Sequence, residues 1–172
     1  GAIYLQNSSS AVLNKLNIDN NSAENGAGIA MTSSNPSITN TVLSNNNADS
    51  TGGAIAMYSN SNPGLYNMVI YSNYAAQYGG AIFSTNSSPT IGNSTITNNQ
   101  SEFDGGGLNL SVGSNAEVMN SIFYNNIPDQ IFITDINDLL DISNSNVDGG
   151  INGIGYSHET SSLSTSLVTW DY

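Results

Sequence analysis

Short apolar segments alternate with polar turns along the whole chain. Each segment has about four residues, alternates apolar with polar side chains, and is bounded by Gly, Pro, Asn or Ser. Segments this short, with a period of two residues, predict β-strands, and no stretch of ten residues carries the apolar stripe of a helix. The pattern therefore predicts an all-β protein.

The apolar segments recur at a fixed interval. The stretch 79–99, GGAIFSTNSSPTIGNSTITNN, matches 52–73 and 26–46, and diverged copies begin at residues 1 and 105. One apolar column, with steps of 26 or 27 residues, contains Ile3, Ile29, Ile55, Ile82 and Leu108. Three strands per repeat cannot build a core alone, but stacked copies give every strand a parallel neighbour about 4.8 Å away. We therefore predict a single-stranded parallel β-helix of about six coils, which begin near residues 1, 26, 52, 79, 105 and 129.

Two further apolar columns predict the rest of the core. The second strand of each repeat contributes Val12, Ile38, Leu65, Ile91 and Val118. The third contributes Leu43, Ile70, Ile96 and Phe123. In the first repeat the register of the third strand stays open, because Asn17 falls in this column between Leu16 and Ile18. Stacking of aliphatic side chains, at ~25 cal/mol per Å² of buried apolar surface, is expected to dominate stability.

Asparagine occupies two columns of its own, and the chain holds 28 Asn. Each column falls at the end of an apolar strand, where a turn leaves backbone groups unpaired and an amide can both donate and accept. We predict that both columns point inward as structural ladders of hydrogen-bonded amides. The first column is Asn14, Asn40, Asn67, Asn93 and Asn120, and the second is Asn20, Asn46, Asn73, Asn99 and Asn126.

The interval shortens toward the C-terminus. Ile131 and Ile133 predict the first strand of a sixth coil, so we assign residues 1–150 to the β-helix. Residues 151–172 match no repeat, and they hold the only Trp and the only His, His158, which is expected to be solvated. We predict that they form a C-terminal cap over the open strand edge or, alternatively, an assembly tail.

The repeat resembles a known group of sequence motifs. These are GGAI at 52–55 and 79–82, an aliphatic-x-x-Asn at 70–73 and 96–99, and FYNN at 123–126. They resemble the GGAI and FxxN repeats of chlamydial polymorphic outer membrane proteins and, more widely, the pectate-lyase-like β-helix repeats of large secreted bacterial proteins. The resemblance, over residues 1 to about 150, implies a right-handed helix and an extracellular or cell-surface location. It implies no single function, because that superfamily includes lyases, hydrolases, adhesins and passenger domains.

Charge excludes several classes of partner. The chain has one Lys, no Arg and 13 acidic residues, which give a net charge of -12. Without cations to replace phosphate counterions, binding to nucleic acid or anionic membrane is not expected, and no apolar run is long enough for direct membrane insertion. The chain begins within a repeat and without Met, so we expect a piece of a longer precursor. The partners we expect are other copies, neighbouring repeats of that longer chain, or surface polysaccharide.

The residue inventory argues against an enzyme. The resemblance to polysaccharide lyases implies a cationic base with acidic Ca²⁺ ligands, but Lys15 is the only basic side chain besides His158. Hydrolysis of glycosides needs clustered carboxylates, whereas the acidic residues are scattered over different coils. Asp135, Asp138 and Asp141 are candidate Ca²⁺ ligands, although their spacing is not that of an EF-hand. No other cofactor is expected.

Tyrosines gather in the third repeat, where they are a candidate binding surface. They are Tyr58, Tyr66, Tyr71, Tyr74 and Tyr78. Exposed aromatic rings on a flat β-face can stack on sugars or dock a protein, or they can merely fill turns, and both interpretations stay open. We interpret the chain as a non-catalytic extracellular module with a structural or adhesive role, which can assemble end to end into a filament. The alternative is a carbohydrate-binding module of a secreted polysaccharide-active protein.

Overall fold

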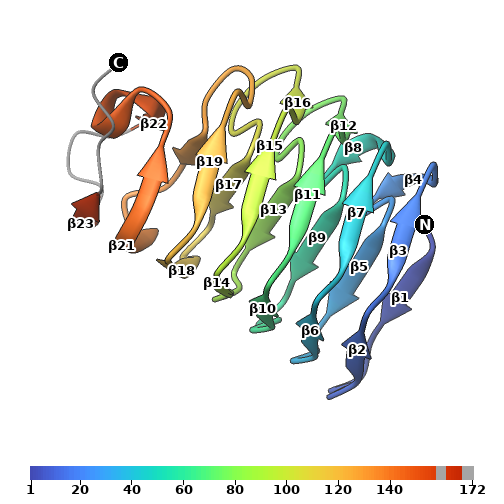
Figure 1. The fold of residues 1–172 in the computed structure, drawn as a ribbon. Coiled ribbons are helices and arrows are strands. Elements are labelled where there is room, and N and C mark those ends of the chain that lie inside the picture. The colour runs from blue at the N-terminus through green and yellow to red at the C-terminus, as the bar shows by residue number, and fades with distance from the viewer. Residues whose placement is uncertain (158–161, 168–172) are drawn as a thin grey trace.

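The computed structural model describes residues 1–157 and 162–167, which wind into a parallel β-solenoid (Figure 1). Each coil contributes strands to different faces, and the strands of one coil pair with their counterparts in the next. All of the pairings between the described strands are parallel. The predicted fold class, an all-β parallel β-helix, is confirmed.

Sheet A collects the first strand of each coil and has seven strands within the described residues. They are β1 (Ile3–Leu5), β5 (Ile29–Thr32), β9 (Ile55–Tyr58), β13 (Ile82–Thr85), β17 (Leu108–Ser111), β20 (Ile131–Ile133) and β22 (Ile154–Tyr156). The register follows the predicted column, since Ile29 lies between Ile3 and Ile55 of the adjacent strands. Like side chains therefore stack on like.

Sheets B and C collect the second and third strands, and they are joined through the long β21 (Leu139–Val147). Sheet B contains β2 (Val12–Asn14), β6 (Ser37–Thr39), β10 (Gly64–Tyr66), β14 (Thr90–Gly92), β18 (Asn115–Met119), the first part of β21 and β23 (Ser162–Leu167). Sheet C contains β3 (Asn17–Asp19), β7 (Val42–Ser44), β11 (Val69–Tyr71), β15 (Thr95–Thr97), β19 (Ile122–Tyr124) and the last part of β21.

Sheet D is a short fourth sheet that the apolar pattern did not predict. It contains β4 (Ser22–Asn25), β8 (Asn47–Thr51), β12 (Tyr74–Ala75) and β16 (Gln100–Ser101). Ala23, Ala48 and Ala75 stack on its inner side and form a small core of their own. Because these strands are mostly polar and their inward residues are small, they carry no aliphatic signal, and the prediction of three strands per repeat is wrong.

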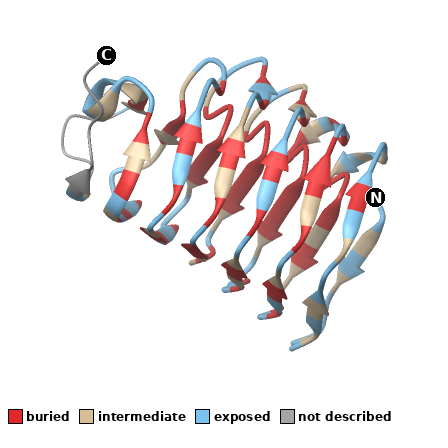
Figure 2. Cartoon of the chain, viewed as in Figure 1, coloured by how far each residue is buried: buried red, intermediate tan, exposed pale blue. Residues whose placement is uncertain are grey.

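Aliphatic side chains from sheets A, B and C fill the interior, and Figure 2 shows buried residues recurring on successive strands. Ile55, Leu65 and Ile70 of one coil are fully buried and meet in this core. None of the buried side-chain N or O atoms among the described residues lacks a hydrogen-bond partner. The core is thus continuous along the solenoid, and its polar atoms are satisfied.

The first coil has a different register from the one predicted. Leu13, and not Val12, pairs with Ile38, and Val12 is 76% exposed. In sheet C the inward residue is Ile18, which pairs with Leu43. The interval between paired residues of the first and second coils is 25 residues in these two sheets, whereas we predicted 26. A shift of one residue moves every side chain of a strand to the opposite face. The placement of Val12 in the core is therefore wrong.

The solenoid continues beyond residue 150, where we predicted its end. The 3₁₀ turn η1 (Gly150–Gly153) leads into β22, which pairs with β20, while β23 pairs with β21. The interval between these paired strands is 23 residues, as between Ile131 and Ile154. The described part of 151–172 therefore adds strands to sheets A and B. His158 and Trp170 lie outside the described residues.

Candidate functional site

The second asparagine column forms a buried ladder at the corner between sheets C and D. Nδ2 of Asn46 donates to Oδ1 of Asn73 at 2.9 Å, and the same oxygen accepts the backbone N–H of Asn46 at 3.0 Å. Nδ2 also donates to the Ile18 carbonyl at 3.0 Å. Asn99 and Asn126 continue the arrangement, with Nδ2 to Oδ1 distances of 2.9 Å from Asn73 to Asn99 and from Asn99 to Asn126. Each amide therefore uses its full bonding capacity.

The two ends of this ladder differ from the prediction. In the first coil Asn21, and not Asn20, donates to Oδ1 of Asn46 at 2.9 Å, whereas Asn20 is exposed with a φ of 57°. At the other end, Oε1 of Gln130 accepts Nδ2 and the backbone N–H of Asn126 at 2.7 and 3.1 Å. Gln130 thus supplies the last rung, because sheet D ends one coil earlier.

The first asparagine column lies at the corner between sheets B and C, and its prediction as a buried ladder is wrong. Its members Asn14, Asn40, Asn67, Asn93 and Asn120 are all exposed. The last four have φ between 50° and 56°, in the left-handed region that Asn adopts more readily than other non-glycine residues. Some of their amides still bond at the surface, as from Asn40 Nδ2 to Asn14 Oδ1 at 2.9 Å. The column therefore serves the turn and not the interior.

Two ladders of buried hydroxyl groups were not predicted. Oγ of Ser94 accepts the backbone N–H of Met68 at 3.1 Å, and Oγ of Ser121 accepts that of Ser94 at 3.1 Å. At the corner between sheets A and B, Oγ of Ser87 accepts the backbone N–H of Ser61 at 3.1 Å. The sequence does carry a signal, a turn-forming Asn followed directly by Ser or Thr. It occurs at 40–41, 60–61, 86–87, 93–94, 120–121 and 144–145.

The three candidate calcium ligands do not converge. Asp138 is buried and ends the hydroxyl ladder, with Oδ1 accepting the Ser114 backbone N–H at 2.8 Å and Oδ2 that of Asp135 at 2.7 Å. Burial raises the pKa of Asp138 above its ordinary value, while backbone hydrogen bonds lower it and the charge of Asp135 raises it. Asp141 lies exposed on sheet B. Within residues 1–157 and 162–167, no three or more His, Cys, Asp or Glu side chains gather where they could hold a metal.

The five candidate tyrosines lie on different faces of the solenoid. Tyr58 belongs to sheet A, Tyr66 to sheet B, Tyr71 to sheet C and Tyr74 to sheet D, while Tyr78 forms an isolated bridge with Thr51 after β12. One coil visits every sheet within its interval, so residues close in sequence point in different directions. The tyrosines of the third repeat therefore do not make one surface.

Two of these rings already have structural partners on the outer surface. Cβ atoms added at Gly64 and Gly92 would lie 2.9 and 2.7 Å from ring atoms of Tyr66, so this ring covers the space above both glycines. An aromatic ring over glycine is a known way to stabilise a sheet. The Tyr78 ring packs on Phe103 with centroids 5.6 Å apart. Tyr66 and Tyr78 thus fill space on the scaffold.

The hydroxyl of Tyr74 is engaged as well. It donates to Oε1 of Glu102 at 2.8 Å, and this hydrogen bond raises the pKa of Tyr74 above its ordinary value. Tyr71 differs, because it is exposed on sheet C in a column with Thr97 and the exposed Tyr124. Of the predicted surface, Tyr71 is exposed and Tyr58 borders a hollow.

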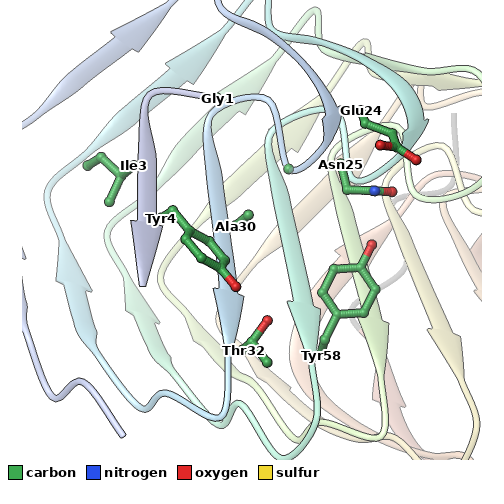
Figure 3. A pocket seen from close by; sticks show the side chains of 9 residues that line it. Gly1, Ile3, Tyr4, Glu24, Asn25, Ala30, Thr32 and Tyr58 are labelled. Carbon is green, nitrogen blue, oxygen red and sulfur yellow. The ribbon is translucent and has the colours of Figure 1, made fainter. Parts of the chain in front are cut away.

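Tyr58 borders a hollow of about 370 Å³ on the outer face of sheet A (Figure 3). Tyr4 of β1 and Tyr58 of β9 stand on either side of β5, whose Ala30 and Thr32 lie between them. Glu24 and Asn25, at the end of β4, line the hollow near the Tyr58 hydroxyl, and Gly1 and Gly26 complete the border. Tyr4 was not among the predicted binding residues, because it belongs to the first repeat.

Hydrogen bonds and packing hold one wall of this hollow in place. Oγ1 of Thr51 donates to Oδ1 of Asn25 at 2.8 Å and is hydrogen-bonded to the Tyr58 hydroxyl at 2.6 Å. The Tyr58 ring also packs on Phe83, with centroids 5.9 Å apart. Burial raises the pKa of Tyr58 above its ordinary value, the Thr51 hydrogen bond lowers it, and the Glu24 carboxylate raises it. Tyr58 is fixed, whereas Tyr4 is 61% exposed.

Comparison with protein families agrees with this architecture. The family model for a right-handed β-helix region matches residues 1–168, so the chain belongs to the right-handed β-helix family. The match extends into 151–168, as the strands do. No curated protein matches the chain. The family includes enzymes and non-enzymes, so membership gives the fold and not the activity. Across the described residues, no helix has the length and hydrophobicity to cross a membrane.

Proposed function

We propose that this chain is a non-catalytic module of an extracellular or cell-surface protein, with a structural or adhesive role. The use of its polar side chains carries the proposal. In the buried ladders, Asn, Ser and Thr side chains form hydrogen bonds between adjacent coils. Such bonds make a rigid rod that holds outward side chains at fixed spacing. The one lysine, Lys15, lies exposed at a turn with a φ of 57°, apart from any carboxylate cluster.

The carboxylates support the same role. Asp19 accepts hydrogen bonds from Asn45 and Ser44 of the next coil, which lower its pKa below the ordinary value. Asp138 accepts two backbone N–H groups. Glycoside hydrolases need two carboxyl groups that face each other across a substrate. Both aspartates instead bind their own scaffold.

The first experiment measures turnover. The protein is incubated with acidic and neutral polysaccharides, with and without Ca²⁺, and unsaturated and reducing ends are assayed. We expect no release above the buffer control. Turnover that persists through purification and disappears on replacement of a carboxylate, such as Asp19→Asn or Asp104→Asn, would overturn the proposal.

The second experiment measures adhesion. Beads coated with the protein are tested on intact cells and on extracellular matrix, and beads coated with heat-unfolded protein are the control. We expect retention that requires the folded protein. Equal retention of beads with folded and with unfolded protein would contradict the adhesive role, and only the structural role would then be proposed.

Carbohydrate binding is the second candidate, and one observation favours it. Tyr71 and Tyr124 stand exposed on sheet C, in register with Thr97 between them, and no charged residue belongs to this column from Tyr71 to Tyr124. Two rings separated by two strand spacings, roughly 9.6 Å, can stack on alternate units of an extended neutral polysaccharide. We expect Tyr71→Ala with Tyr124→Ala to abolish any binding on a glycan array, whereas Thr90→Ala on sheet B leaves it unchanged. Binding that survives the double change would exclude this face.

A further inference from the structure

We propose that the hollow between Tyr4 and Tyr58 binds a small organic cation, a quaternary or protonated amine, against the faces of the two rings. The inference rests on the proposed function, a module whose outer faces bind and do not catalyse. It adds a ligand class and a site that the sequence did not indicate. Three features carry it: the placement of the rings, the charge around them, and the use of their polar neighbours.

The rings stand at a distance that suits a cation between them. β1 and β9 are separated only by β5, so their backbones lie two strand spacings apart, roughly 9.6 Å. Tyr4 is in register with Ala30 and Tyr58 with Thr32, so the two residues are also offset by about 7 Å along the strands, and their backbones are about 12 Å apart. The Tyr4 ring extends toward Thr32 (Figure 3), and a group held midway is about 6 Å from each side, at the limit over which a cation is attracted to an aromatic face. Ala30, small and on the strand between, leaves this space open (Figure 3).

The charges around the hollow favour a positive ligand. The Glu24 carboxylate lines it and is close enough to act on the Tyr58 hydroxyl. The net charge of the chain is -12, and Lys15 is not among the lining residues.

Part of the polar lining is already hydrogen-bonded within the protein. The Tyr58 hydroxyl, Thr51 Oγ1 and Asn25 Oδ1 form one hydrogen-bonded chain. A sugar in a pocket needs several convergent polar groups that are free to bond with it. The hydroxyls of Tyr4 and Thr32 also line the hollow and could bond a sugar, so glucose is the competing ligand in the test below. An amine with apolar substituents matches the ring faces and the Glu24 carboxylate.

The test compares choline with 3,3-dimethyl-1-butanol, which has the same shape without the charge. Binding is followed by NMR titration on the folded 172-residue protein. We expect choline to bind saturably and several-fold more tightly than the neutral alcohol. Tyr4→Leu and Tyr58→Leu should each weaken choline binding about two- to tenfold, whereas Tyr58→Phe, which keeps the ring, should change it less.

Matched variants separate charge from shape. Glu24→Gln should weaken choline binding about two- to fivefold and leave the neutral alcohol unchanged. Glu117→Gln, on sheet B, is the control and should change the binding of neither ligand. A circular dichroism spectrum confirms that each variant is folded.

Three results would overturn the inference. They are the absence of saturable choline binding, equal affinity for choline and the neutral alcohol, and preferential binding of glucose that depends on Tyr4. None of these affects the turnover assay. Conversely, release of sugar ends from a polysaccharide would overturn the proposed function whether or not choline binds.

Discussion

Asparagine has two roles in this protein: it forms left-handed turns, and it forms the buried amide ladder. Two consecutive residues show one role each. Asn98 has a φ of 55° and an exposed side chain, while Asn99, the next residue, is buried in the amide ladder. The first uses the low cost of the left-handed conformation for Asn. The second uses an amide that can donate twice and accept twice. A column of asparagines can arise from either property.

Replacement of one residue of each kind should separate the two roles. Asn73→Leu removes the acceptor of both Asn46 donors and leaves the Leu43 carbonyl without its side-chain donor. We expect a loss of about 3–5 kcal/mol in the free energy of unfolding, measured with urea at pH 7. Asn67→Leu, at an exposed turn, should cost about 1 kcal/mol, and Asn67→Gly should cost less. Equal losses at residues 67 and 73 would contradict the assignment.

Asp138 predicts a pH dependence. Burial raises its pKa in the folded state, so the folded protein keeps this proton to a higher pH than the unfolded chain does. The contribution of Asp138 to stability is therefore fully present below the unfolded pKa, about 4, and is lost as pH rises through the folded pKa. Asp138→Ser restores the hydroxyl that the ladder has at Ser114. We expect the stability of this variant relative to the native chain to increase as pH rises from about 3 to 7.

The matched control for this pH profile is Asp141→Ser. Asp141 is exposed on β21, three residues further along the chain. Urea unfolding at each pH measures both variants against the native chain. Parallel curves for Asp138→Ser and Asp141→Ser would show that the buried carboxylate does not titrate as we infer.

At the scale of elements, the corner between sheets D and A depends on glycine. Gly79 has a φ of 67°, and a Cβ there would lie 2.5 Å from the Ile82 carbonyl oxygen. Gly52 repeats both features, with a φ of 66° and a distance of 2.4 Å to the Ile55 carbonyl oxygen. The corner brings sheet D back onto sheet A so tightly that no side chain fits. The predicted GGAI motif therefore reports a backbone turn.

Gly79→Ala should be much more destabilising than Gly113→Ala. Both residues have positive φ, 67° and 75°, but a Cβ at Gly113 would meet nothing within 4 Å. We expect about 1 kcal/mol for Gly113→Ala from the conformation alone. Gly79→Ala should cost at least about 2 kcal/mol more, because the backbone must shift. Thermal unfolding measures both, and equal shifts in Tm would mean that the steric contact is absent in solution.

At the scale of the molecule, each coil is stabilised by the coils beside it. Leu5 and Leu13 of the first coil are only partly buried, whereas Met57 and Leu65 of the third coil are fully buried. Stability should therefore vary along the solenoid. The two candidate binding faces, on sheets A and C, lie on different sides of the same rod.

Hydrogen exchange should reveal this gradient. We expect the backbone amides of β1, β2 and β3 to exchange at least about tenfold faster than those of β9, β10 and β11, because the first coil packs on one neighbour only. The measurement is exchange followed by NMR or mass spectrometry at low protein concentration. Uniform protection along the chain would contradict it. Slower exchange of the first coil at high concentration would instead support end-to-end assembly, which stays a prediction.

The sequence by itself determined the solenoid and most of the aliphatic columns in its core. Identical residue types at a fixed interval stack on one another, so the interval alone assigns Ile29, Ile55 and Ile82 to one column. The same argument identified the ladder through Asn46, Asn73 and Asn99. A repeat interval states which residues are neighbours along the axis.

Only the tertiary structure decided where each side chain points around that axis. Direction depends on the left-handed turns at the corners and on the pairing of each strand, and a shift of one residue reverses it, as at Val12 and Leu13. For that reason Asn67 is exposed at a turn, and Asn21 takes the place in the amide ladder that was predicted for Asn20. The tyrosines of one repeat are spread over four sheets for the same reason. Tyr4 and Tyr58, from different repeats, meet across β5 because stacking turns a long sequence separation into two strand spacings.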